Sequence, residues 1–98
     1  MLKKFYSTRD AVSGIFNQPF EQYNEAVAKR SFKEATENVE GIKEHAQDME
    51  LYFIGEFDNE TGIFVPAGVP ELILKGVKKE WKQNLELLGT EEQAKYQK

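Results

Sequence analysis

The side chains that could act on a substrate or hold a metal ion are few in this sequence. The only histidine is His45, between Glu44 and Asp48, and there is no cysteine. A zinc site needs several such ligands at defined spacings, which are absent. The acidic segment 58–62 (DNETG) lacks the remaining ligands of a calcium loop and is typical of a β-turn. We therefore expect no catalytic residue, no metal site, no cofactor and no enzymatic activity.

Aromatic residues suggest a different chemistry, because single-stranded nucleic acids stack their bases on sheet aromatics beside Lys and Arg. Strand alternation places Tyr52 on the face opposite Phe53 and Phe57. One face of the sheet must cover a helix, where rings would be core residues, and the other face could stay open. Tyr6 is the residue that we expect to stack on a base. The set expected to contact DNA, if DNA binds, is Lys3, Lys4, Tyr6, Arg9, Lys29, Arg30 and Lys33.

The charge distribution argues against nucleic-acid binding over the whole surface. The net charge is −4, and residues 37–70 contain one Lys and eight Asp or Glu. Such an acidic surface repels phosphates, although a local basic face remains compatible with it. No apolar run approaches the roughly 20 residues needed to cross a bilayer, and no signal peptide is recognised. We expect a protein without membrane contact, in the cytoplasm where it is made.

Two hairpins and a helix are expected to position these side chains. Residues 3–9 and 14–18 have strand composition, are joined by an Asp10-to-Gly14 turn, and are limited by Pro19. Asn24 is a good N-cap for a helix over 25–38, whose apolar residues recur at helical spacing.

A second hairpin follows the helix, with strands at 51–57 and 62–65 and a turn that contains Gly62. Its segment DNETGIF matches the segment DAVSGIF of the first hairpin at a spacing of 48 residues. Either two hairpins use the same turn chemistry, or the fold is pseudo-symmetric with equivalent hairpins in one sheet.

Residues from Pro70 onward favour a second helix that ends at Gly89. Its apolar stripe could pack on the domain's own sheet. Alternatively, the stripe could pair two chains, with Trp81 as the anchor. The residues of this possible oligomer interface are Leu74, Val77, Trp81, Leu85 and Leu88.

These elements predict an α+β fold. Two β-hairpins would form an antiparallel sheet of about four strands with one packed helix, in the order ββαββ, plus the C-terminal helix. Residues 1–70 would form the ββαββ domain. Residues 71–98 would form the C-terminal helix and a frayed tail, as part of the same domain or as an oligomerisation element.

Several blocks of the sequence resemble a known family. The segments NQPF (17–20), NEAVAKRSF (24–32) and HAQDMELYFIGEFDNETGIF (45–64) are similar to the small non-structural protein of gokushoviruses, which are single-stranded DNA bacteriophages of the Microviridae. The resemblance covers roughly residues 3–66. It implies a non-virion phage protein in the bacterial cytoplasm, with no catalytic residues to carry over.

Two hypotheses for the function follow. In the first, the protein is a phage accessory protein that assists replication or packaging of single-stranded DNA, through contacts with phage or host proteins and possible weak DNA binding. In the second, it is a homo-oligomeric interaction module that modulates a host or phage protein through the Trp81 helix without binding DNA.

Overall fold

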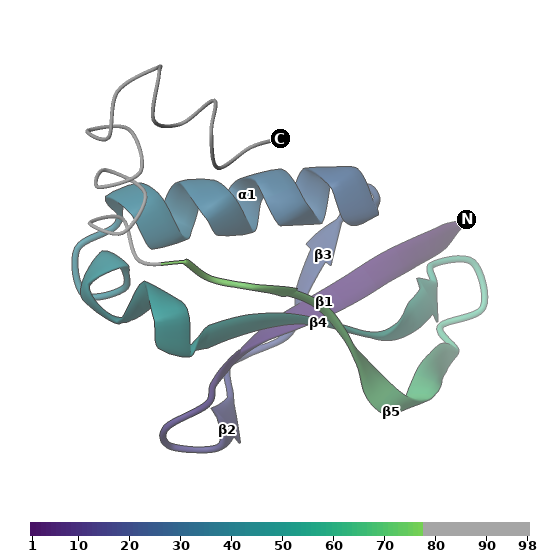
Figure 1. The fold of residues 1–98 in the computed structure, drawn as a ribbon. Coiled ribbons are helices and arrows are strands. Elements are labelled where there is room, and N and C mark those ends of the chain that lie inside the picture. Colours follow the sequence, from purple (N-terminus) through teal and green to yellow (C-terminus); the bar gives the residue numbers. More distant parts are fainter. Residues whose placement is uncertain (78–98) are drawn as a thin grey trace, which may run out of the picture.

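The computed structural model describes residues 1–77, which form one curved antiparallel sheet with one α-helix (Figure 1). Within these residues, 47% lie in strands and 26% in helices. The strands are β1 (Leu2–Asp10), β2 (Ile15–Phe16), β3 (Phe20–Gln22), β4 (Met49–Asp58) and β5 (Phe64–Lys75). The helix α1 (Glu25–Asn38) and the 3₁₀ segment η1 (Lys43–Asp48) connect β3 to β4.

The central pair of the sheet is β1 with β4. The strand order is β2-β1-β4-β5, and β3 also pairs with β1, further along the same edge as β2. The return strands β2 and β5 therefore flank the antiparallel β1–β4 pair on opposite sides. The β1–β2 turn and the β4–β5 turn lie at opposite ends of this pair (Figure 1).

The predicted α+β fold with the order ββαββ is wrong. Three strands precede the helix, because the chain pairs with β1 again over Phe20–Gln22 after Pro19. β5 continues to Lys75 through Pro66, Gly68 and Pro70, where a loop and a helix were predicted. An edge strand tolerates proline, since one of its sides needs no hydrogen-bond partner within the sheet. The predicted domain boundary at residue 70 lies inside this strand.

The local prediction for α1 is confirmed. Asn24 has an extended backbone, with φ of −158°, and its side chain accepts a 2.9 Å hydrogen bond from the Val27 amide. This bond satisfies one of the free donors at the helix start, and Glu25 adds a negative charge at the positive end of the helix dipole. Val39, which follows the helix end, is 45% exposed and does not extend the apolar side of the helix.

The core lies between α1 and one face of the sheet. Tyr6, Ala28, Phe32 and Leu51 form its buried cluster, and each is at most 5% exposed. Burying a side chain of the size of Leu or Phe contributes roughly 1.5–3 kcal/mol, so this small set supplies a modest hydrophobic stabilisation. Tyr6 and Leu51 come from the central strands β1 and β4, which fixes the face of the sheet that the helix covers.

Candidate functional site on the open face of the sheet

The face of the sheet opposite α1 is here called the open face. Along β1, Tyr6 points to the core, so alternation places Phe5, Ser7 and Arg9 on the opposite side. Directly paired residues of antiparallel strands share a face, so the pairing register extends the open face across the sheet. Its residues are Lys3, Phe5, Ser7, Arg9, Phe16, Glu21, Glu50, Tyr52, Phe57, Phe64, Leu72 and Lys75.

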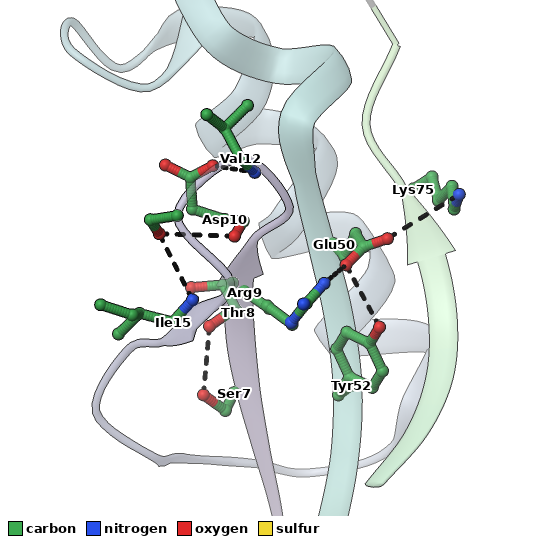
Figure 2. Close-up of polar contacts among 10 residues, drawn as sticks. Ser7, Thr8, Arg9, Asp10, Val12, Ile15, Glu50, Tyr52 and Lys75 are labelled. Atoms are coloured by element: carbon green, nitrogen blue, oxygen red, sulfur yellow. Dashed lines mark hydrogen bonds and ion pairs between the residues drawn. The ribbon is translucent and has the colours of Figure 1, made fainter.

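A buried carboxylate organises one end of the open face. Glu50 is 7% exposed and accepts hydrogen bonds from Arg9 Nη1 at 3.0 Å and Tyr52 Oη at 3.1 Å (Figure 2). Its second oxygen lies 3.8 Å from Lys75 Nζ. Figure 2 shows the three partners converging on this carboxylate from β1, β4 and β5. A buried charge needs such partners, so the contacts hold Arg9 and Tyr52 in fixed positions.

An exposed aromatic ring lies over this network. The Phe16 ring centroid is 5.0 Å from that of Tyr52, with the rings inclined at 64°. The guanidinium carbon of Arg9 lies 5.8 Å from the Phe16 centroid, within the range of a cation–π interaction. Phe16 nevertheless remains 40% exposed. We call Arg9, Phe16, Glu50, Tyr52 and Lys75 the Arg9 cluster.

A second group of rings occupies the other end of the same face. Phe5 contacts Phe57 and Phe64 in edge-to-face geometry, with centroid distances of 6.4 and 5.9 Å. Phe64 is 43% exposed, and its ring lies across Gly55, where a Cβ atom would be only 2.8 Å from two of its carbons. Lys3 pairs with Phe57 across the strands, but its ammonium lies 3.6 Å from Glu21 of β3, on the edge of β1 away from β4 and β5. We call Phe5, Phe57 and Phe64 the Phe64 cluster.

The acidic residues of the sheet are divided between its two faces. Glu56 and Glu71 lie on the helix side with Tyr6, since they pair with Lys4 and Phe53. Burial raises the pKa of the Tyr6 hydroxyl above its ordinary value, and the charges of Glu25, Glu56 and Glu71 raise it further. Carboxylates of α1, β4 and β5 therefore lie near the Tyr6 hydroxyl.

The open face has a small excess of positive charge. Its cations are Lys3, Arg9 and Lys75, and its carboxylates are Glu21 and Glu50. Both carboxylates are paired, because Glu21 lies 3.6 Å from Lys3 and Glu50 lies 3.0 Å from Arg9. The objection drawn from the acidic middle segment therefore applies to the helix side more than to the open face.

The predicted DNA-contacting residues do not form one surface. Lys3 and Arg9 lie on the open face, whereas Lys4 and Tyr6 point to the other side. Tyr6 is 1% exposed, so its ring has no free surface on which a base could stack. The remaining predicted residues, Lys29, Arg30 and Lys33, belong to α1, which covers the opposite face.

Tyr6 was the one aromatic residue among the predicted DNA contacts, whereas the open-face rings most exposed to solvent are Phe16 and Phe64. The repeated Gly-Ile-Phe after each turn contained the signal, because it places Phe16 and Phe64 at equivalent points of two hairpins. Glu50 and its partner Arg9 are 41 residues apart, and no local pattern joins them.

Of the residues predicted for an oligomer interface, two are described. Leu74 lies on β5 and packs against the core cluster, and Val77 is 39% exposed beyond the strand end. Trp81, Leu85 and Leu88 lie outside the described residues. His45 is exposed in η1, and residues 1–77 contain no group of three or more metal-ligating side chains. No helix within the described part of the chain has the length and apolar character needed to cross a membrane.

Comparison with known proteins gives one match. A family model described as Phage ORF5 protein matches residues 3–79, which is most of the chain. No curated protein and no solved structure matches.

Proposed function

Because this chain belongs to the Phage ORF5 protein family, we propose that it is a phage accessory protein that binds single-stranded DNA on its open face and assists replication or packaging of a phage genome. The similarity of residues 3–66 to the gokushovirus non-structural protein points to a single-stranded DNA phage of the Microviridae as its source. In this proposal the protein works in the cytoplasm of the host bacterium, together with phage or host replication or packaging proteins.

The observation that carries the proposal is the exposed Phe16 ring, held beside Tyr52 and Arg9. Nucleic-acid bases stack on aromatic rings with about 1–3 kcal/mol per base, and a neighbouring guanidinium adds attraction for the phosphate and for the base. The Glu50 contacts fix Arg9 and Tyr52 before any ligand arrives, which lowers the ordering cost of binding.

Single strands suit this face better than duplex DNA. The faces of bases in a duplex are already stacked, whereas a single strand can turn its bases toward protein rings. Duplex binding also depends on many phosphate contacts, and the open face offers only three cations against two carboxylates. Stacking should therefore supply most of the affinity.

Salt dependence separates these contributions. With about two or three phosphates neutralised, the logarithm of the affinity should fall with the logarithm of the salt concentration with a slope of about −1.4 to −2. If DNA bound to the cations of α1 instead, replacing Lys3 would leave the slope of affinity against salt unchanged.

Fluorescence anisotropy with an oligothymidylate of about 12 nucleotides tests the site. Phe16→Leu and Lys3→Ala should each weaken binding. The matched controls are Tyr23→Leu, which is 78% exposed at the start of α1, and Lys33→Ala on α1 itself. The controls should bind like the unchanged protein. Equal loss in Lys33→Ala and Lys3→Ala would contradict the open-face site, and no binding in any form would contradict the proposed function.

A second candidate is a homo-oligomeric interaction module that acts without DNA. The observation that favours it is the exposure of apolar side chains along the edge strand β5. Val69 is 84% exposed, Val65 is 56% exposed and Leu72 is 45% exposed. An exposed edge strand can pair with another chain, and apolar side chains on it favour such contact. Light scattering should then give a mass above that of one chain, and Val69→Asp should reduce it.

A further inference from the structure

The two aromatic clusters of the open face occupy equivalent positions. Each contains the Phe that follows a Gly-Ile pair after a hairpin turn, and each of these rings is about equally exposed, at 40% for Phe16 and 43% for Phe64. The pairing register agrees, since Phe16 lies opposite Arg9 on β1 and Phe64 lies opposite Phe57 on β4. Each exposed ring has a tilted aromatic neighbour, and Phe16 also has the Arg9 guanidinium beside it.

The clusters are separated along β1. Phe64 lies level with Lys3 and Phe16 level with Arg9, so the exposed rings are six residues, or about 20 Å, apart along β1, and the β1–β4 pair also separates them across the sheet. Ser7 lies between them on the same face but is only 2% exposed, and its hydroxyl donates a 2.7 Å hydrogen bond to the Asn17 carbonyl. The middle of the open face therefore holds the buried Ser7 and the exposed Leu72, and within residues 1–77 no ring outside the two clusters lies between them.

We infer that the open face holds two distinct base-stacking subsites, the Arg9 cluster and the Phe64 cluster, which one DNA strand must bridge to bind with full affinity. This inference rests on the proposed function. The ligand class follows from the two ends together, because each offers an exposed ring for a base and the Arg9 end also offers a cation for a phosphate. A stacked strand rises about 3.4 Å per nucleotide, so bridging more than about 20 Å takes more than about six stacked nucleotides, or fewer if the strand is stretched.

The subsites differ in chemistry. The guanidinium of Arg9 lies over Phe16, so that subsite combines stacking with a charge. The Phe64 cluster is a group of three rings above Gly55, with Lys3 at its border and in an ion pair with Glu21. Binding at the Arg9 cluster should therefore depend more on salt than binding at the Phe64 cluster.

Two oligonucleotide lengths test the inference on the full chain. A thymidine dinucleotide is too short to bridge the subsites, so at high concentration it should shift two separate groups of backbone amide resonances, one at each cluster. Phe16→Leu should remove only the first group of shifts, and Phe64→Leu only the second. For an oligothymidylate of about 12 nucleotides, each replacement should lower the affinity by about fivefold or more. Leucine keeps the apolar contacts, and unchanged amide spectra elsewhere would show that both variants fold.

The outcomes separate this inference from the proposed function. Dinucleotide shifts at one end only, or at neither end while the longer strand binds, would overturn the two-subsite arrangement and leave DNA binding intact. Loss of both groups of shifts in a single variant would also overturn it. If neither length binds, the proposed function itself fails.

Discussion

The turn of the β1–β2 hairpin and the turn of the β4–β5 hairpin are built from the same contacts. Gly14 donates to the Asp10 carbonyl at 2.8 Å, and Gly62 donates to the Asp58 carbonyl at the same distance. The two glycines have φ of 75° and 77°. Each aspartate side chain also accepts a 2.9 Å bond from the amide two residues later. A hydroxyl before each glycine accepts a 3.3 Å bond from the following isoleucine.

The return strands of the two hairpins differ after these turns. In the first hairpin, β2 stops at Phe16, and the chain pairs with β1 again only from Phe20. In the second, β5 runs through a bulge between Pro66 and Glu71 and stays paired with β4 at both ends. Turn geometry is thus set by a few local residues. The length of the return strand depends instead on the position of proline and on the backbone hydrogen bonds that the neighbouring strand still offers.

The residue pairs that flank the two turns differ as well. Arg9 faces Phe16 in the first hairpin, and Phe57 faces Phe64 in the second. The first hairpin therefore places a charge on the open face, and that charge is held by the buried Glu50. The same turn geometry therefore presents different side chains in the two hairpins. Substitutions in one hairpin at a time can measure the contribution of each.

The largest effect is expected from Gly55→Ala, which affects only the second hairpin. The new Cβ would lie 2.6 Å from the Val65 carbonyl oxygen and 2.8 Å from the Phe64 ring, and φ is 153°. Backbone strain and overpacking together should lower the free energy of unfolding by about 4 kcal/mol. Urea denaturation measures this change.

Gly41→Ala is the control for Gly55→Ala. Gly41 also has a positive φ, of 85°, but no atom lies within 4 Å of its Cβ position. It should cost about 1 kcal/mol, which is the backbone term alone. Similar costs for the two variants would show that the Phe64 ring does not depend on the absence of a side chain at residue 55.

The next largest effect is expected in the first hairpin, from Arg9→Met. The nearest cation of Glu50 is lost, and only the exposed Lys75 at 3.8 Å and the Tyr52 hydroxyl remain. Breaking a buried pair costs about 3–5 kcal/mol, and since the Arg9 side chain is 30% exposed we expect about 2 kcal/mol. Urea denaturation should also show that adding Glu50→Gln restores part of this loss, about 1 kcal/mol. A fully additive double variant would contradict the coupling.

Smaller and equal effects are expected at the two turn glycines. Gly14→Ala and Gly62→Ala each force alanine into the left-handed region, at a cost of about 1 kcal/mol. Neither position is crowded, since the nearest atom to a Cβ at Gly14 is Arg9 Nη2 at 3.5 Å and none lies within 4 Å at Gly62. Thermal unfolding should give matching shifts. Costs that differ by more than about 0.5 kcal/mol would break the equivalence of the turns.

The parts of the fold predicted from sequence are those with local causes. The bounds of α1 followed from Asn24 and the helical spacing of its apolar residues, and both turns followed from aspartate and glycine. β3 and the length of β5 were missed because each lies beyond a proline, where local rules end a strand. Leu74 also matched a helical stripe, although it packs on the core from a strand.

The candidate site depends on which face of the sheet the helix covers, and the sequence alone does not show this. Tyr6 and Phe16 are both aromatic residues of strand-like segments, and only the position of α1 makes one a core residue and the other an exposed one. The ion pair of Arg9 with Glu50 joins segments 41 residues apart. Tertiary contacts of this kind override local propensity, and no periodic pattern in the sequence reveals them.

The smallest effect distinguishes the two turn aspartates by pH. The hydrogen bond from the Glu60 amide lowers the pKa of the Asp58 carboxyl, and the Thr61 side chain and the charged amino terminus, 3.7 Å away, lower it further. A lowered pKa in the folded state stabilises the fold above the unfolded-state value near 3.9, and this stability is lost as the pH falls through the folded-state pKa. Asp58→Asn should therefore flatten the decline in melting temperature below about pH 5. Asp10→Asn, at the far end of β1 from the amino terminus, is the control and should flatten it less. Equal flattening in both variants would mean that the amino terminus adds nothing to the second turn and that the two turns match in their electrostatics as well as in their backbone.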